Sequence, residues 1–320
     1  MMRSSAIAAL AALLLPGPIA AAAPGIETGV FHDAGRGRDV PYTAYWPDGQ
    51  KGPRPVVIFS HGLGGTANAA PYLGRALSRA DFIAIHIQHA GSDASVYRGS
   101  QGRRQISEAL RASVHVPANG RNRFLDLPFV LDTLARRNAA GPWANKMDLG
   151  RVGMAGHSYG ARSALVAAGQ RVGKKYVSLR DARIRAGIAI STSAPGGNLD
   201  LGRTFGDISI PLLHITGTKD RGAFSWRSQI TPASRLEPYR RIGAPIQYLL
   251  VLEGADHYVF SAKRLGTRRE KPLDRAHIAS VGRLATAFFQ AHLLGDAQAL
   301  AWLRSEFSKT LAAGDRFTIR

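Results

Sequence analysis

The strongest constraint on the fold is a regular alternation of two kinds of segment, which begins near Pro55 and continues to about Leu294. Short runs of β-branched and other apolar residues, typical of buried strands, alternate with longer segments of helical apolar spacing. Strands that are separated by helices pair in parallel through right-handed crossovers. The pattern therefore predicts an α/β fold with a mostly parallel central sheet and helices on both faces.

Two earlier apolar runs flank a turn-rich segment at residues 33–37 and predict an opening hairpin, which brings the expected total to about eight strands. The expected strands are 29–32, 40–46, 56–60, 82–87, 151–155, 184–190, 210–216 and 246–252. The expected helices are 69–79, 124–137, 161–170, 232–241 and 277–294. In a sheet of this kind, binding and chemistry belong in the loops at the carboxyl ends of the strands.

Residues 1–23 have the features of a secretory signal peptide: a charge at Arg3, a short apolar run and an alanine-rich end. The apolar run is shorter than the roughly 20 residues of a spanning helix, so we expect cleavage rather than a retained anchor. The sequence predicts export to the periplasm or the medium, without stable membrane insertion. No repeat or linker interrupts residues 24–320, which we expect to form a single domain.

The chain is strongly basic, with 42 Lys and Arg against 22 Asp and Glu and a formal net charge of +20. The cations are spread along the chain, and aromatic residues are not interleaved with the short basic clusters as a base-stacking platform requires. We therefore expect a solvated basic surface and no nucleic-acid partner. Attraction to an anionic polymer or envelope is the alternative.

The segment Gly156-His157-Ser158-Tyr159-Gly160 follows a predicted strand and precedes a predicted helix. A serine at the apex of such a sharp turn is presented as a nucleophile, and the residues two positions away must be small to avoid collision. Ser158 is therefore the candidate nucleophile. The alternative is a glycine-rich turn without chemistry.

The first strand of the parallel core leads into a glycine-rich loop, His61-Gly62-Leu63-Gly64-Gly65. Acyl transfer requires two preorganised N–H donors for the negative oxygen of the tetrahedral intermediate. We assign these oxyanion donors to the backbone amides of Leu63 and Tyr159. The loop also fits a dinucleotide fingerprint, but the next strand ends in Gln88 rather than in the acidic residue that binds the ribose. We therefore expect no dinucleotide cofactor.

Two further strand ends supply the partners of a serine nucleophile. Asp220 follows the strand at 210–216 and is the candidate acid, with Asp200 as the alternative. His257 follows the strand at 246–252 and is the candidate general base, because an imidazole can accept and return a proton near neutral pH. The order Ser158, Asp220, His257 is the order used on the α/β-hydrolase sheet.

These residues give the chain a resemblance to α/β-hydrolases of the dienelactone-hydrolase-like group, which includes platelet-activating-factor acetylhydrolases. The resemblance rests on segments 59–65, 156–160 and 254–257, with support from 125–132 and 181–186, and it spans most of residues 28–294. It implies a serine carboxylic-ester hydrolase that works through an acyl-serine intermediate on a small-molecule ester, without metal or cofactor.

The sequence departs from that group in two ways. Dienelactone hydrolases use a cysteine nucleophile, and this chain has no cysteine. In the acetylhydrolase branch the acid follows the strand after the nucleophile helix, where this chain has Ser191-Thr192-Ser193. Two other functions remain open at this point: a non-catalytic binding protein on a hydrolase fold, and a serine peptidase that uses the same triad.

More than thirty residues connect the strand at 82–87 to the helix at 124–137, and a short helix is expected around 105–112. Long connections beside a cleft usually have a function. We expect this one, together with Phe224-Ser225-Trp226, to shape the substrate pocket. Since there is no obvious lid domain, small or accessible esters are favoured over buried lipid chains.

Overall fold

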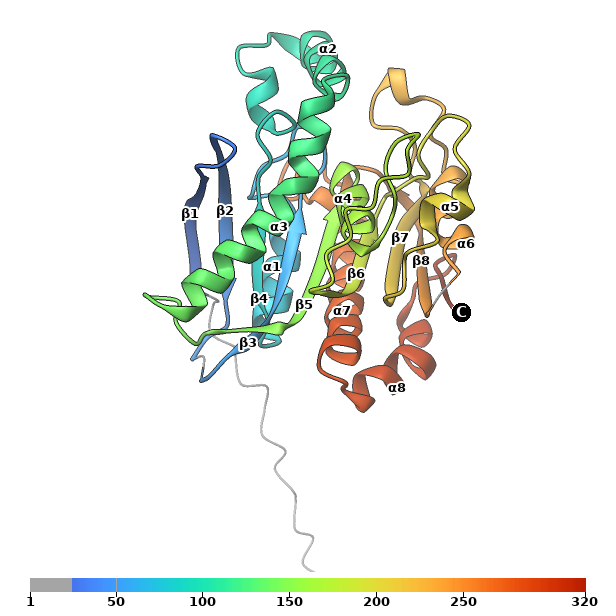
Figure 1. Cartoon of the computed structure of the whole chain (residues 1–320). Helices are drawn as coiled ribbons and strands as arrows, with labels where there is room; N and C mark the ends of the chain where they lie inside the picture. The colour runs from blue at the N-terminus through green and yellow to red at the C-terminus, as the bar shows by residue number, and fades with distance from the viewer. Residues whose placement is uncertain (1–24, 50, 244) are drawn as a thin grey trace, which may run out of the picture.

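The computed structural model describes residues 25–49, 51–243 and 245–320; the predicted signal peptide lies outside these ranges. Strands from both ends of the described chain join one nine-stranded sheet (Figure 1), in the order β1-β2-β4-β3-β5-β6-β7-β8-β9. The strands are β1 (Gly25–Asp33), β2 (Arg38–Trp46), β3 (Arg54–Ser60), β4 (Ile83–Ile87), β5 (Met147–His157), β6 (Ile184–Ile190), β7 (Leu212–Lys219), β8 (Gln247–Asp256) and β9 (Arg316–Ile319).

The six strands from β4 to β8 in this order pair in parallel, as the alternation predicts. The hairpin β1–β2 joins antiparallel to β4 at one edge, and β9 joins antiparallel to β8 at the other. The expectation of a mostly parallel α/β sheet is confirmed. All parallel strands end at the same side of the sheet, so their following loops meet there.

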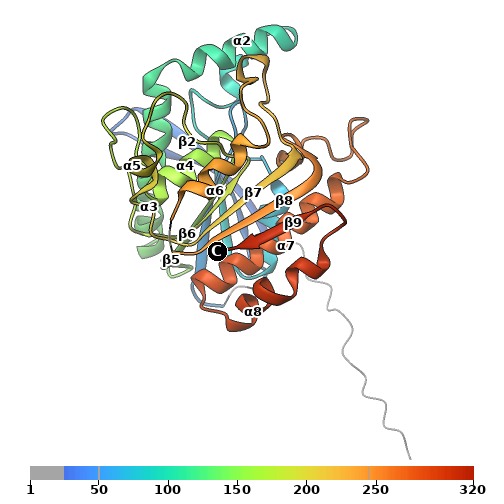
Figure 2. The same cartoon turned by 90° about the vertical axis from the view of Figure 1, so that its right-hand side faces the viewer.

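The sequence predicts about eight strands, one fewer than the sheet contains. The strand that was not predicted is β9 (Arg316–Ile319). Its four residues alternate between exposed and half-buried positions, so it has no continuous apolar run of the kind that marks a buried strand. It forms by pairing with β8, from Tyr248 opposite Ile319 to Val251 opposite Arg316. Figure 2 shows β9 beside β8 at the edge of the sheet.

Each face of the sheet carries its own apolar core. Alternate residues of β3 point to opposite faces: Val57 and Phe59 belong to one core cluster, and Val56 and Ile58 belong to the other. Helices α1, α7 and α8 cover the first face, and α3 and α4 cover the second. The helices are α1 (Pro71–Arg79), α2 (Gly102–Val114), α3 (Pro117–Ala139), α4 (Tyr159–Ala168), α5 (Leu201–Phe205), α6 (Glu237–Arg241), α7 (Asp274–Leu293) and α8 (Ala297–Ser305).

The long connection after β4 contains two helical segments and leads directly into a longer α3 than expected. A 3₁₀ turn, η1 (Ala94–Tyr97), precedes α2 (Gly102–Val114), and α3 begins at Pro117 rather than near residue 124. Helix α2 lies above the sheet, at the top of Figure 1. Two shorter elements, α5 and α8, were also not anticipated from the sequence.

Several histidines are buried inside the fold, and burial favours the neutral form of His86, His89 and His214 among them. Burial lowers the pKa of His86 to about 3, against the opposing effect of its hydrogen bond with the Ala69 carbonyl. Burial likewise lowers the pKa of His214 and of His89 to about 4 each. In the unfolded chain these side chains return to the ordinary histidine pKa near 6.5, so unfolding takes up protons below that pH.

We predict that the free energy of unfolding falls as the pH drops from about 6.5 toward 4. In this range the three histidines take up protons in the unfolded chain but stay neutral in the folded protein, so protonation favours unfolding. Each histidine contributes a slope of roughly 1.4 kcal/mol per pH unit in this window. Thermal unfolding followed by circular dichroism between pH 7.5 and 4 measures the slope. His86→Phe should flatten it, whereas His32→Gln, which changes an exposed side chain, should not. A melting temperature that stays constant down to pH 4.5 would contradict this account.

Candidate active site

The turn between β5 and α4 presents Ser158 in a strained conformation. Ser158 has φ 57 and ψ −114, a region that residues with side chains rarely adopt. A Cβ atom on Gly156 would collide with the backbone of Gly160, and one on Gly160 would collide with the carbonyl of Ser60. Both flanking positions must therefore be glycine, as the sequence motif predicts.

The structure brings the three candidate triad side chains into one hydrogen-bonded chain. His257 Nε2 lies 2.9 Å from Ser158 Oγ, and His257 Nδ1 lies 2.9 Å from Asp220 Oδ1. The residues follow the ends of three different strands, β5, β7 and β8. In the neutral tautomer that carries its proton on Nδ1, the imidazole donates to the carboxylate, and Nε2 can accept the proton of the serine hydroxyl, as a general base must.

Asp220 is fully buried and held as a carboxylate. Burial by itself raises its pKa, but the hydrogen bond from His257 and the charges of His257 and Arg235 outweigh burial and lower the pKa to about 2. Two hydroxyls donate to the second oxygen: Ser191 Oγ lies 2.6 Å and Thr216 Oγ1 lies 2.8 Å from Asp220 Oδ2. The carboxylate is thus fixed in orientation and charged at neutral pH.

The residue that directly follows β6 supports the carboxylate of Asp220. Ser191, with φ 57 at the end of β6, donates its hydroxyl to Asp220. The alternative acid, Asp200, is exposed and caps α5, where Oδ1 accepts from the Arg203 amide at 3.1 Å. His257 therefore contacts Asp220 and not Asp200.

Arg235 is a buried neighbour of the triad that the sequence did not single out. Its Nε lies 3.2 Å from Asp220 Oδ1, and its Nη2 lies 2.9 Å from His257 Nδ1. Because the guanidinium is a cation without an acceptor, it offers no site for the Nδ1 proton of His257. Arg235 lies in a 3₁₀ turn before α6 and also donates to the Ser191 carbonyl, so it joins the loops after β6 and β7.

Both predicted oxyanion residues line the same cleft as Ser158. In the glycine-rich loop, the amides of Gly64 and Gly65 are already bonded to the carbonyls of Ser92 and Gly62. Tyr159 begins α4, so its amide has no partner within the helix. The amides of Leu63 and Tyr159 therefore remain the predicted oxyanion donors.

A buried polar network supports the glycine-rich loop from below. Arg123, which is 0% exposed, donates to the hydroxyls of Ser60, Ser92 and Ser163 and to the His61 carbonyl. Its guanidinium also stacks on the Tyr159 ring at 4.6 Å. His61 itself bonds the Gly62 carbonyl and accepts from the His89 amide. These contacts fix His61 against the loop and help to set the shape of the loop.

The same network contains a second serine–histidine–aspartate chain. His89 Nε2 lies 2.9 Å from Ser60 Oγ, and His89 Nδ1 lies 2.9 Å from Asp126 Oδ2. These three side chains are at most 1% exposed. The distances between these side chains match those around Ser158. Because no substrate can reach them, they stabilise the interior of the protein and take no part in catalysis.

The cleft at Ser158 has a volume of about 580 Å³. Its walls include Arg111 and Val114 from α2, Phe224, and Trp226 from the 3₁₀ turn η2 (Ser225–Arg227). The Trp226 indole donates to Ser107 Oγ at 3.1 Å, which joins η2 to α2 over the cleft. Both the long connection, through Arg111 and Val114, and the segment with Phe224 and Trp226 thus contribute to the lining of the cleft.

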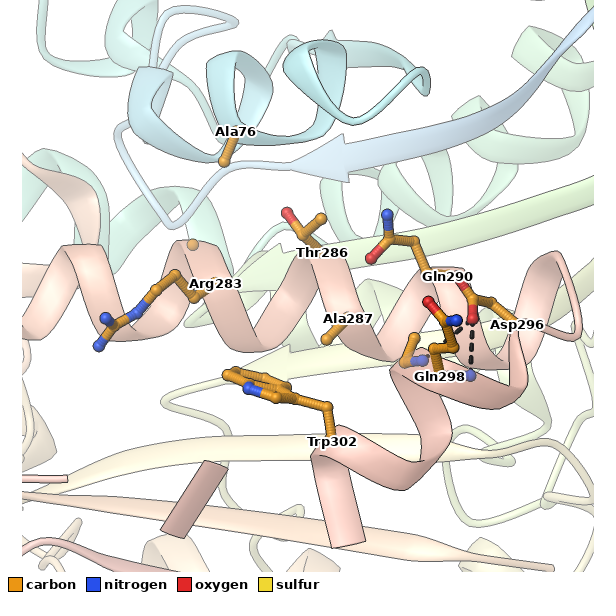
Figure 3. Close-up of a pocket in the computed structure, with 10 residues that line it drawn as sticks. Ala76, Arg283, Thr286, Ala287, Gln290, Asp296, Gln298 and Trp302 are labelled. Atoms are coloured by element: carbon orange, nitrogen blue, oxygen red, sulfur yellow. Dashed lines mark hydrogen bonds between the residues drawn. The ribbon is translucent and has the colours of Figure 1, made fainter. Parts of the chain in front are cut away.

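A separate cavity of about 660 Å³ lies between α7 and α8 beside α1 (Figure 3). Trp302 extends from α8 along α7, and Ala287, Thr286 and Ala76 are close by. None of the candidate site residues lines it. Within the described ranges, no group of three His, Asp or Glu side chains is arranged to hold a metal ion, and no helix is long and apolar enough to cross a membrane.

Comparison of the sequence with models of known protein families gives no match, and no curated protein is detectably similar to it.

Proposed function

We propose that the protein is a serine carboxylic-ester hydrolase with an α/β-hydrolase fold. The observation that carries this proposal is the chain Ser158–His257–Asp220, with both contacts at 2.9 Å, at the wall of an accessible cleft. The strained Ser158 turn and the two amides beside it supply the remaining parts of an acyl-transfer site. The resemblance to dienelactone-hydrolase-like esterases supports the same reaction.

In the proposed reaction, Ser158 Oγ attacks the ester carbonyl while His257 Nε2 takes the hydroxyl proton. The Leu63 and Tyr159 amides stabilise the negative carbonyl oxygen, and each such donor is worth about 3 kcal/mol in comparable enzymes. His257 then protonates the leaving alcohol, and the acyl group remains on Ser158. A water molecule, deprotonated by His257, releases the acid and restores the serine.

Asp220 has two parts in this cycle. It holds His257 in the tautomer with the proton on Nδ1, and its charge stabilises the imidazolium that forms during attack. Burial strengthens this electrostatic effect, because water does not screen the pair. We expect small or extended esters as substrates, and export of the enzyme would give it access to esters outside the cytoplasm.

A fluorophosphonate probe tests the proposal, since it phosphonylates only an activated serine. We expect labelling at Ser158, mapped by mass spectrometry of the digested protein. Ser60 is an internal control: it has the same histidine and carboxylate spacing but is buried, and should remain unlabelled. Failure to label Ser158 in folded protein would argue against an activated nucleophile and in favour of a non-catalytic binding protein.

A further inference from the structure

The cleft at Ser158 is rich in cations. Arg111, Arg162, Arg227 and Arg235 line it, and Glu237 is the one carboxylate among its lining residues. Two of these five charged groups are already engaged: Arg235 pairs with Asp220, and Glu237 pairs with Arg240 and Arg241 at 3.0 and 3.4 Å. The other three arginines form no ion pair within the described part of the chain.

Arg162 and Arg227 are the half-buried members of this group. Arg162 lies one helical turn after the candidate nucleophile, and its amide bonds the Ser158 carbonyl at 3.3 Å. Its guanidinium stacks on Phe124 at 5.7 Å, and its buried Nε has no hydrogen-bond partner among the described residues. A buried guanidinium nitrogen without a partner is unfavourable unless a ligand supplies the acceptor.

Arg227 approaches the same region from the end of η2. It stacks on its neighbour Trp226 at 4.9 Å, and no described side chain accepts a hydrogen bond from its guanidinium. Burial lowers the pKa of Arg227, and the nearby positive charge of Arg162 lowers it further. Both arginines line the same cleft, and neither forms an ion pair with a carboxylate in the described part of the chain, so their like charges are not neutralised there.

We propose that Arg162 and Arg227 form a subsite for a carboxylate carried by the ester substrate. This inference rests on the proposed function and specifies its substrate class: esters that bear a negative charge on the acyl or the alcohol side. A carboxylate in the cleft would accept hydrogen bonds from the guanidinium groups and neutralise part of their positive charge. Guanidinium groups suit this task, because their forked N–H donors bind carboxylates in two-point geometry.

Matched ester pairs test the subsite on either side of the scissile bond. Mono-4-nitrophenyl glutarate is compared with 4-nitrophenyl valerate, and 4-acetoxybenzoate with phenyl acetate, after subtraction of spontaneous hydrolysis. We expect at least one anionic ester to exceed its neutral partner in kcat/KM, and the excess to shrink with added salt. Equal or lower kcat/KM for both anionic esters would overturn the proposal.

Arginine variants connect any preference to the two residues. Arg162→Gln and Arg227→Gln should each lower kcat/KM for the preferred anionic ester by about 10- to 100-fold, and for its neutral partner far less. Neither should lower the melting temperature appreciably, because neither substitution breaks an ion pair of the described chain. Arg304→Gln, which removes an equal charge from α8, is the control for net charge. Equal losses on anionic and neutral esters would show that the arginines do not recognise the carboxylate.

A binding measurement separates this inference from the proposed function. Ser158→Ala protein is titrated by calorimetry with glutaric acid monoanilide and with the neutral valeranilide. Binding of the anionic anilide that Arg162→Gln weakens supports the subsite even if no ester is turned over. Hydrolysis of neutral esters without selective binding of the anionic anilide would leave the esterase intact and refute the subsite.

Discussion

Replacing Ser158 with alanine is expected to lower kcat for 4-nitrophenyl butyrate by about 10⁴- to 10⁶-fold, which is the size of the loss when a triad serine is removed. Without the hydroxyl, His257 has no proton to accept and no acyl-serine can form. What remains is the contribution of the amides at Leu63 and Tyr159 and of substrate positioning. Initial rates and the amplitude of the pre-steady-state burst measure the loss.

The fold should survive this substitution, because alanine is close to serine in size and the strain at φ 57 applies to both. Unchanged thermal unfolding is therefore the first check on the variant. Ser193→Ala is a matched control, since Ser193 lines the same cleft without a hydrogen bond to His257, and its loss should leave turnover in place. Undiminished turnover in purified Ser158→Ala protein would refute Ser158 as the nucleophile.

Replacing Asp220 with asparagine is expected to lower kcat by about 10⁴-fold, because the substitution forces His257 into a tautomer that cannot act as the base. Ser191 and Thr216 donate hydroxyl protons to the oxygen that faces away from His257. In the variant, the amide oxygen satisfies these donors, so the NH₂ group turns toward His257 Nδ1. The imidazole must then carry its proton on Nε2, where it cannot accept the proton of Ser158.

The matched control is Asp200→Asn, at the position that the sequence left as an alternative acid. Asp200 caps α5, and asparagine is an equally good N-cap residue, so both activity and stability should be retained. The pH dependence of kcat/KM provides a second readout for Asp220→Asn. A larger loss in Asp200→Asn than in Asp220→Asn would reverse the assignment of the acid.

The fold class followed from the sequence because burial on both faces of a parallel sheet requires continuous apolar strands, and these are visible without a structure. Strand β9 was missed for the opposite reason. Its four residues have no apolar run, and only the edge of β8 makes them a strand. Likewise α8 completes a core against α7 that cannot be inferred from its own nine residues.

The candidate triad was also visible in the sequence, because each member directly follows a strand and all parallel strands end at one side of the sheet. Arg235, Arg162 and Arg227 had no such signal. They lie in turns or on a helix surface of a chain that is rich in arginine everywhere, so neither composition nor spacing distinguishes them. Their positions beside the cleft depend on how the loops after β6 and β7 pack against α2 and α4.

The sequence alone determined the α/β architecture, the strained serine turn and the identity of Ser158 and His257 as candidate partners, since these depend on local pattern and on strand order. Only the tertiary structure decided between Asp220 and Asp200, because two carboxylates in successive loops are equivalent until distance to His257 separates them. It also decided which arginines lack a carboxylate partner. An ion pair depends on contact in three dimensions, and its two partners can lie far apart along the chain, so the sequence does not reveal which arginines are paired.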